Sequence, residues 1–299
     1  MAPPVPGQLH LCSSDPTLTA FEFASPSSSP SSPNLVLFIG GLSDSFLSVP
    51  YLQRLNATLA SHGWGLAQAQ LRSAGHGWGG ANVKEDAEQL GAIVRYFREE
   101  QGKEKVVLFG HSTGCQDAIA YAHLLSTGSS LPPLDGIVLQ APVSDREPTE
   151  HYWPHIIPRE PRSSYDLDEF VPSAWSKTYF CISGVTNRRW LSLMTPPPSD
   201  TIDLLESEDF FSSDLSDTRL SNAFGAVSCP LLVLLGGNDA YPPHVKEKLP
   251  QLLQRFEEAT GKKHWSPLSK IIEGASHNIS EKPQAQQMAD TVVQFVQGV

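Results

Sequence analysis

The sequence predicts an α/β fold, a mostly parallel eight-stranded sheet with helices on both faces and a lid insertion. Short apolar runs with β-branched residues, such as Leu35–Ile39 and Val106–Phe109, alternate along the chain with stretches of helical period, such as 83–100. Strands have this composition when helices cover both faces of a parallel sheet. Residues 146–222 interrupt the alternation and are too many for a simple connection.

Eight strands are expected in chain order, followed or separated by five helices. The strands are placed at residues 9–12, 19–24, 35–39, 65–70, 106–109, 136–140, 230–235 and 270–273, and the helices at 49–61, 83–100, 114 to Gly128, 245–258 and 284–297. The first two strands are predicted to be antiparallel at one edge, and the Ser/Pro-rich residues 25–33 form a flexible loop after them. We therefore divide the chain into a core, 1–145 and 223–299, and a lid or cap, 146–222.

The composition of the chain disfavours some classes of binding partner. The 299 residues carry a formal net charge of −11 and no dense cluster of lysine and arginine, which disfavours nucleic acid as a partner. No apolar run approaches the roughly 18 residues of a membrane span, and the first residues lack the basic start and apolar centre of a signal peptide. The cysteines lack metal-ligand spacing and resemble reduced packing residues; they are Cys12, Cys115, Cys181 and Cys229. We expect a cytoplasmic protein without cofactor or metal, in an oligomeric state that stays open.

The candidate nucleophile is Ser112, in the G-x-S-x-G sequence of residues 110–114. This pentapeptide lies between the strand pattern ending at Phe109 and a helix pattern, which is the context of a nucleophile elbow. In that tight turn the flanking positions must be glycine, and the serine oxygen projects from the end of the sheet. The alternative is a glycine-bracketed turn without chemistry.

A serine hydroxyl needs a base, and the base needs an acid to orient it, in the chain order serine, acid, histidine. Asp239 follows the seventh predicted strand, and His277 follows the eighth. Both should lie at the carboxyl edge of the sheet, where sites on parallel sheets are found. Asp145, after the sixth strand, is the alternative acid, although we favour Asp239. His111 is expected to point away from the site.

Two backbone amides are predicted to receive the oxyanion. Thr113 directly follows the nucleophile at the start of a helix, whose dipole favours negative charge there. Leu42 follows Gly40-Gly41 after the third strand, where the glycines let the backbone approach closely. A simple glycine turn is the other interpretation of Leu42.

The predicted lid contains enough aromatic area for an apolar substrate wall, although its aromatics could equally form the lid's own core. Arg188, Arg189 and Trp190 are candidate substrate-binding residues, because adjacent arginines could neutralise an acidic substrate group. Pairing with the acidic residues of the lid is the alternative for both arginines.

Four segments resemble the fungal DUF1749 (UPF0613) family of α/β-hydrolases, from about residue 8 to the carboxyl terminus: Leu37–Asp44, Val49–Tyr51, Gly110–Asp117 and Arg189–Leu193. Characterised members are intracellular esterases of hydroxamate siderophores of the fusarinine C type. The resemblance implies an α/β-hydrolase fold and the same activity class, and the triad of the family carries over to Ser112, Asp239 and His277.

The expected function is therefore hydrolysis of a small-molecule carboxylic ester through a Ser-His-Asp triad and an acyl-enzyme, with a fusarinine-type siderophore as substrate. A lipid or thioester hydrolase would use the same triad with another lid pocket. A non-catalytic ligand-binding protein of this fold is a second alternative, and it would require a broken or blocked triad. Enzymes with a carboxylate nucleophile are disfavoured because Ser112 occupies that position.

Overall fold

A computed structural model describes residues 4–25, 32–180 and 184–299, with the backbone alone at residue 180. Most of the predicted Ser/Pro-rich loop and Cys181 lie outside these ranges. Eight strands form one sheet in the order β1-β2-β4-β3-β5-β6-β7-β8. Their bounds are β1 Gly7–Ser14, β2 Thr17–Phe23, β3 Asn34–Ile39, β4 Trp64–Gln70, β5 Lys105–His111, β6 Gly136–Gln140, β7 Leu231–Gly236 and β8 Lys270–Ile272.

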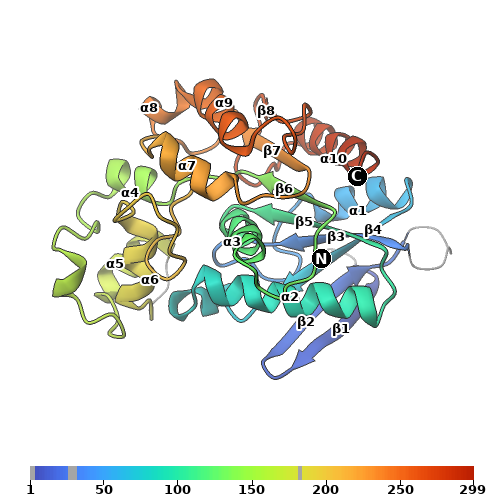
Figure 1. The fold of residues 1–299 in the computed structure, drawn as a ribbon, viewed down its shortest axis with the longest axis horizontal. Coiled ribbons are helices and arrows are strands. Elements are labelled where there is room, and N and C mark those ends of the chain that lie inside the picture. The colour runs from blue at the N-terminus through green and yellow to red at the C-terminus, as the bar shows by residue number, and fades with distance from the viewer. Residues whose placement is uncertain (1–3, 26–31, 181–183) are drawn as a thin grey trace.

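The sheet is parallel from β4 to β8 and antiparallel at its amino-terminal edge (Figure 1). In the centre, Leu37 on β3 pairs with Leu108 on β5, and Leu108 pairs with Ile137 on β6. This confirms the predicted mostly parallel eight-stranded sheet with an antiparallel first pair. The carboxyl ends of β5, β7 and β8 consequently lie along one edge, which brings together loops that are far apart in the sequence.

Helices cover both faces of the sheet. The described helices are α1 Leu52–Ala60, α2 Val83–Glu99, α3 Gly114–Ser126, α4 Arg146–Tyr152, α5 Ser173–Phe180, α6 Asn187–Met194, α7 Asp217–Phe224, α8 Pro243–Lys246, α9 Leu249–Thr260 and α10 Lys282–Val296, with short 3₁₀ turns at Gly75–Gly80 and Arg162–Ser164. Leu35 and Leu37 pack toward α2, α3 and α9, whereas Val36 and Phe38 pack toward α1 and α10. The apolar run of this strand is continuous because both of its faces are buried.

One helix differs from its prediction. The single helix expected at 245–258 is two helices, α8 and α9, and Pro250 occupies the first turn of α9. Proline has no N–H to continue a helical ladder, but it is accepted in a first turn, where that N–H would have no partner. A new helix, α9, therefore begins with the proline in its first turn.

The segment between β6 and β7 has a small core of its own. It is built from Trp78 of the first 3₁₀ turn and residues of the predicted lid, namely Ile156, Val171, Val185, Trp190, Leu193 and Met194. Farther along, Phe210 and Phe224 belong to the main core. The division at 146–222 remains a prediction, and the packing favours a lid core confined to its first fifty residues. Within the described part of the chain, none of the helices combines the length and apolar character that a membrane crossing requires.

Candidate active site

Ser112 occupies a strained turn between β5 and α3. Its φ is +53°, in the left-handed region that non-glycine residues rarely adopt. Side chains would not fit on either side. A Cβ on Gly110 would lie 2.3 Å from the carbonyl oxygen of Gly114, and a Cβ on Gly114 would lie 2.5 Å from that of Ile39. This is the local geometry expected of a nucleophile elbow.

Three predicted residues from three loops meet at the edge of the sheet. His277 Nε2 lies 2.9 Å from Ser112 Oγ, and His277 Nδ1 lies 2.8 Å from Asp239 Oδ2. An ionised carboxylate can only accept, so Nδ1 carries the hydrogen and donates it to Asp239. Nε2 of the neutral ring is then free to accept the hydroxyl hydrogen of Ser112.

The protonation of His277 depends on opposing effects. Burial disfavours the imidazolium, but the hydrogen bond and charge of Asp239 outweigh burial and raise the pKa of His277 above its ordinary value. Asp145 and Asp44 add smaller contributions of the same sign. The ring is therefore a stronger base than a free histidine.

Asp145, the alternative acid, lies nearby with other partners. Its carboxylate accepts hydrogen bonds from the Tyr179 hydroxyl at 3.1 Å and from Gln116 Nε2 at 2.9 Å. Burial raises its pKa to about 7. His277 Nδ1 thus donates to Asp239, and Asp145 joins α4 to α5 in the predicted lid.

His111 supports the loop that carries His277. It is buried, and its Nδ1 lies 2.5 Å from Gln140 Oε1 while its Nε2 lies 3.1 Å from the side chain of Asn278. Burial, together with the neighbouring His277, lowers its pKa to about 4, so the ring is neutral. The two ring nitrogens face two amide oxygens, Gln140 Oε1 and Asn278 Oδ1, and a neutral ring donates to only one of them. The expectation that His111 points away from the site is wrong, because its ring centroid lies 5.1 Å from that of His277.

The two amides predicted to receive the oxyanion lie beside the serine. A Cβ on Gly41 would lie 2.6 Å from Ser112 Cβ, so the loop that carries Leu42 touches the nucleophile. Asp44 Oδ2 fixes this loop by accepting from the Gly41 amide at 2.8 Å. Within the described residues, the amides of Leu42 and Thr113 make no hydrogen bond. Both residues line one cavity.

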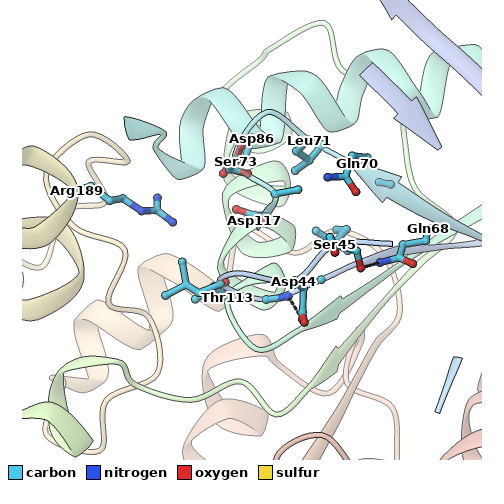
Figure 2. A pocket seen from close by; sticks show the side chains of 16 residues that line it. Asp44, Ser45, Gln68, Gln70, Leu71, Ser73, Asp86, Thr113, Asp117 and Arg189 are labelled. Carbon is cyan, nitrogen blue, oxygen red and sulfur yellow. Dashed lines mark hydrogen bonds between the residues drawn. The ribbon is translucent and has the colours of Figure 1, made fainter. Parts of the chain in front are cut away.

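That cavity lies between the loop after β3, helix α2, helix α3 and the lid (Figure 2). Of the three predicted substrate-binding residues, Arg189 lines it. Trp190 is buried in the lid core and donates from Nε1 to the Ile156 carbonyl, and Arg188 pairs with Asp168 on the surface. Substrate binding by these three residues remains a prediction.

The sequence analysis missed the acidic groups around the cavity. Asp86 and Asp117 line it, and Glu208 pairs with Arg189 at 2.7 Å. A signal was present for Asp86, which lies in the apolar stripe of α2 three residues after Val83 and four before Leu90. A buried acid in such a stripe indicates a special environment. Among the described residues, no group of three or more His, Cys, Asp or Glu side chains could hold a metal ion.

A comparison with known protein families shows to which family the chain belongs. A family described as "Protein of unknown function (DUF1749)" matches residues 1–297. The chain belongs to this family. This DUF1749 protein is 31% identical to Esterase AN6793 of Emericella nidulans, over 97% of the chain and 91% of that relative. It is 29% identical to the Fusarinine C esterase sidJ of Aspergillus fumigatus, over 94% and 92%.

The solved structures agree on the fold. The siderophore hydrolase EstB from Aspergillus fumigatus superposes on this DUF1749 protein with a TM-score of 0.79 and 29% identity, covering 99% of this chain and 96% of the other. The fold is that of the α/β-hydrolases. The DUF1749 protein is thus an α/β-hydrolase, as its sequence predicted.

Proposed function

We propose that this DUF1749 protein is a serine esterase whose catalytic triad is Ser112, His277 and Asp239. The observation that carries the proposal is the continuous pair of hydrogen bonds, 2.9 Å from serine to histidine and 2.8 Å from histidine to aspartate. Ser112 is held in the strained elbow that presents its oxygen to a substrate. The intact geometry argues against a non-catalytic ligand-binding role.

In the proposed mechanism, Ser112 Oγ attacks the ester carbonyl while His277 Nε2 takes its proton. Asp239 keeps the imidazole in the required tautomer and stabilises the cation that forms. The amides of Leu42 and Thr113 donate to the oxyanion, each contributing on the order of 3 kcal/mol of transition-state stabilisation. His277 returns the proton to the leaving alcohol, and water then releases the acyl group by the same steps in reverse order.

For the substrate we propose the ester bonds of a hydroxamate siderophore of the fusarinine type. Two relatives of nearly the same length are named for siderophore chemistry, one of them for fusarinine C. Iron would arrive within the substrate, and the mechanism above uses no cofactor. A cytoplasmic location is part of this proposal. The free thiols of Cys12, Cys115 and Cys229, whose pKa values are raised by burial, suit a reducing compartment.

The test is mass-spectrometric turnover of ferric and iron-free fusarinine C beside a panel of p-nitrophenyl esters of increasing acyl length, with Ser112→Ala in parallel. We expect the siderophore to be cleaved to its monomers and the variant to be inactive but folded. Turnover of the short esters alone would retain the triad and reject the siderophore. A preference for long acyl chains would indicate a lipid hydrolase, and undiminished turnover by Ser112→Ala would reject the triad.

A further inference from the structure

The cavity beside the proposed oxyanion amides contains buried charge that the mechanism does not use. Asp86 and Asp117 face it from α2 and α3, and Arg189 faces it from α6. All three are buried, with exposed fractions of 1%, 6% and 3%. In Figure 2 the two carboxyl groups lie together, and the guanidinium of Arg189 points toward them from the lid.

The charges in this region do not balance. Arg189 has its own partner, because its Nη1 donates to Glu208 Oε1 at 2.7 Å and Ser192 Oγ donates to the same oxygen at 2.6 Å. Asp44 also lines the cavity, but the Gly41 amide and the Ser48 hydroxyl already donate to it. Asp86 and Asp117 are therefore left without a cation of their own among the described residues.

Some polar atoms of these buried side chains also lack a hydrogen-bond partner among the described residues. Asp86 Oδ1 has no hydrogen-bond partner in the described structure, and neither does Arg189 Nε. No described residue donates a hydrogen bond to the carboxylate of Asp117. Burial raises the pKa of Asp86 to about 7 and that of Asp117 well above its ordinary value. Buried carboxyl groups of this kind are costly unless something pairs with them.

We propose that Asp86 and Asp117 bind a primary ammonium group of the substrate, carried on the acyl side one or two carbons from the ester carbonyl. An ammonium supplies the donors that the two carboxyl groups lack, and its positive charge favours their ionised form. The inference rests on the proposed function, because the substrate carbonyl is placed at Leu42 and Thr113, which line the same cavity. It adds the class of ester to that function.

The size of the cavity limits the group to a short arm. The cavity is small, with a volume of about 30 Å³. This small volume favours an ammonium group on one or two carbons over a long acyl chain. Acetylation of the amine would remove the charge and add three heavy atoms, so it should exclude the substrate from this subsite.

The experiment compares alanine benzyl ester with N-acetylalanine benzyl ester near pH 7, where an α-amino group is largely protonated. We expect the wild-type protein to give a kcat/KM at least roughly tenfold higher for the free amine. Asp86→Asn and Asp117→Asn should each lower the ratio of the two kcat/KM values by roughly tenfold to a hundredfold. Asparagine has the shape of the protonated acid, so both variants should fold. Asp290→Asn, at an exposed position on α10, removes the same charge elsewhere and should leave the ratio unchanged.

A wild-type preference for the acetylated ester, or an equal loss for both esters in the variants, would overturn the subsite. Calorimetric titration of alanine benzyl ester into Ser112→Ala, with and without Asp117→Asn, separates this result from failure of the esterase itself. Binding that depends on Asp117, in a protein that hydrolyses no ester, would reject the proposed function and keep the subsite. Hydrolysis without preference for the amine would keep the function and reject the subsite.

Discussion

At the scale of single residues, the basicity of His277 is set by its burial and by its contact with Asp239. Burial lowers its pKa, and the hydrogen bond and charge of Asp239 raise it by more. A general base must be unprotonated in the free enzyme, so its pKa fixes the acid limb of the pH–rate profile. The buried ring of His111 nearby does not obscure this limb, because its pKa is about 4.

The first prediction is that kcat/KM for p-nitrophenyl acetate rises with pH through a midpoint above 6.5 and then levels off. Activity is lost as the pH falls, because His277 becomes protonated and cannot accept the proton of Ser112. Initial rates at constant ionic strength across this range measure the midpoint. A midpoint well below the ordinary histidine value would contradict the assignment of His277 as a base paired with Asp239.

The second prediction concerns Asp239→Asn. The amide removes the charge that raises the pKa of His277, so the midpoint should move to lower pH. It can also favour the wrong tautomer, which lowers kcat by about 10⁴-fold in a comparable triad. The matched variant is Asp145→Asn. In the wild type, the Asp145 carboxylate accepts hydrogen bonds from Tyr179 and Gln116 and makes none with the histidine. This variant should lose much less activity, and a reversed order of the two variants would make Asp145 the acid.

Not every residue of the candidate site could be predicted from the sequence. Ser112, Asp239 and His277 could be located because each follows an apolar strand, and parallel strands end at one edge. Asp86 and Asp117 lie within helices, and their nearness to Arg189 depends on how the lid packs on α2 and α3. This packing joins segments that are far apart in the sequence, so it cannot be predicted from the hydrophobic periodicity of one helix or from the spacing of residues in a motif.

At the scale of elements, the loop after β3 couples the sheet to the nucleophile. Gly41 lies against Ser112, and the adjacent Leu42 is the proposed oxyanion donor. Helix α9 shows the limit of pattern reasoning at this scale. The apolar period of residues 245–258 is continuous, but the backbone chemistry of Pro250 divides the helix.

The third prediction is that Gly41→Ala lowers kcat by roughly a hundredfold with a smaller change in KM, since a displacement of about 1 Å at the reacting groups can cost that much. Its new methyl group would lie 2.6 Å from Ser112 Cβ and 3.1 Å from Oγ, so the loop or the serine must move. Gly80→Ala is the control, because a Cβ at that position meets nothing within 4 Å. Equal kcat values for the two variants would show that the loop after β3 does not position the nucleophile.

At the scale of the whole molecule, the predicted lid is joined to the predicted core through buried polar groups as well as through apolar packing. Arg189 and Glu208 come from the segment between β6 and β7, whereas Asp86 and Asp117 come from core helices. The structure thereby keeps an excess of buried carboxyl groups at the contact between the two parts. Buried groups of this kind link the stability of the fold to pH.

The fourth prediction follows from the sign of that linkage. Burial raises the pKa of Asp86 from 3.8 to about 7, against the attraction of Arg189 and with Glu208, Glu85 and Asp117 as neighbouring acids. The folded protein therefore holds this proton more tightly than the unfolded chain. The resulting stabilisation is complete below about pH 4 and is lost as the pH rises toward 7.

Asp86→Asn remains neutral throughout this range. Relative to the wild type, the variant should gain unfolding free energy between about pH 5 and pH 8, on the order of 1–3 kcal/mol. Urea denaturation at both pH values, with Asp290→Asn as the exposed control, measures the difference. A free-energy difference that stays constant with pH would mean that Asp86 is ionised in the folded protein at pH 5 as well. In that case a cation of the protein would have to neutralise the Asp86 carboxylate. No site for a substrate ammonium would then remain at Asp86.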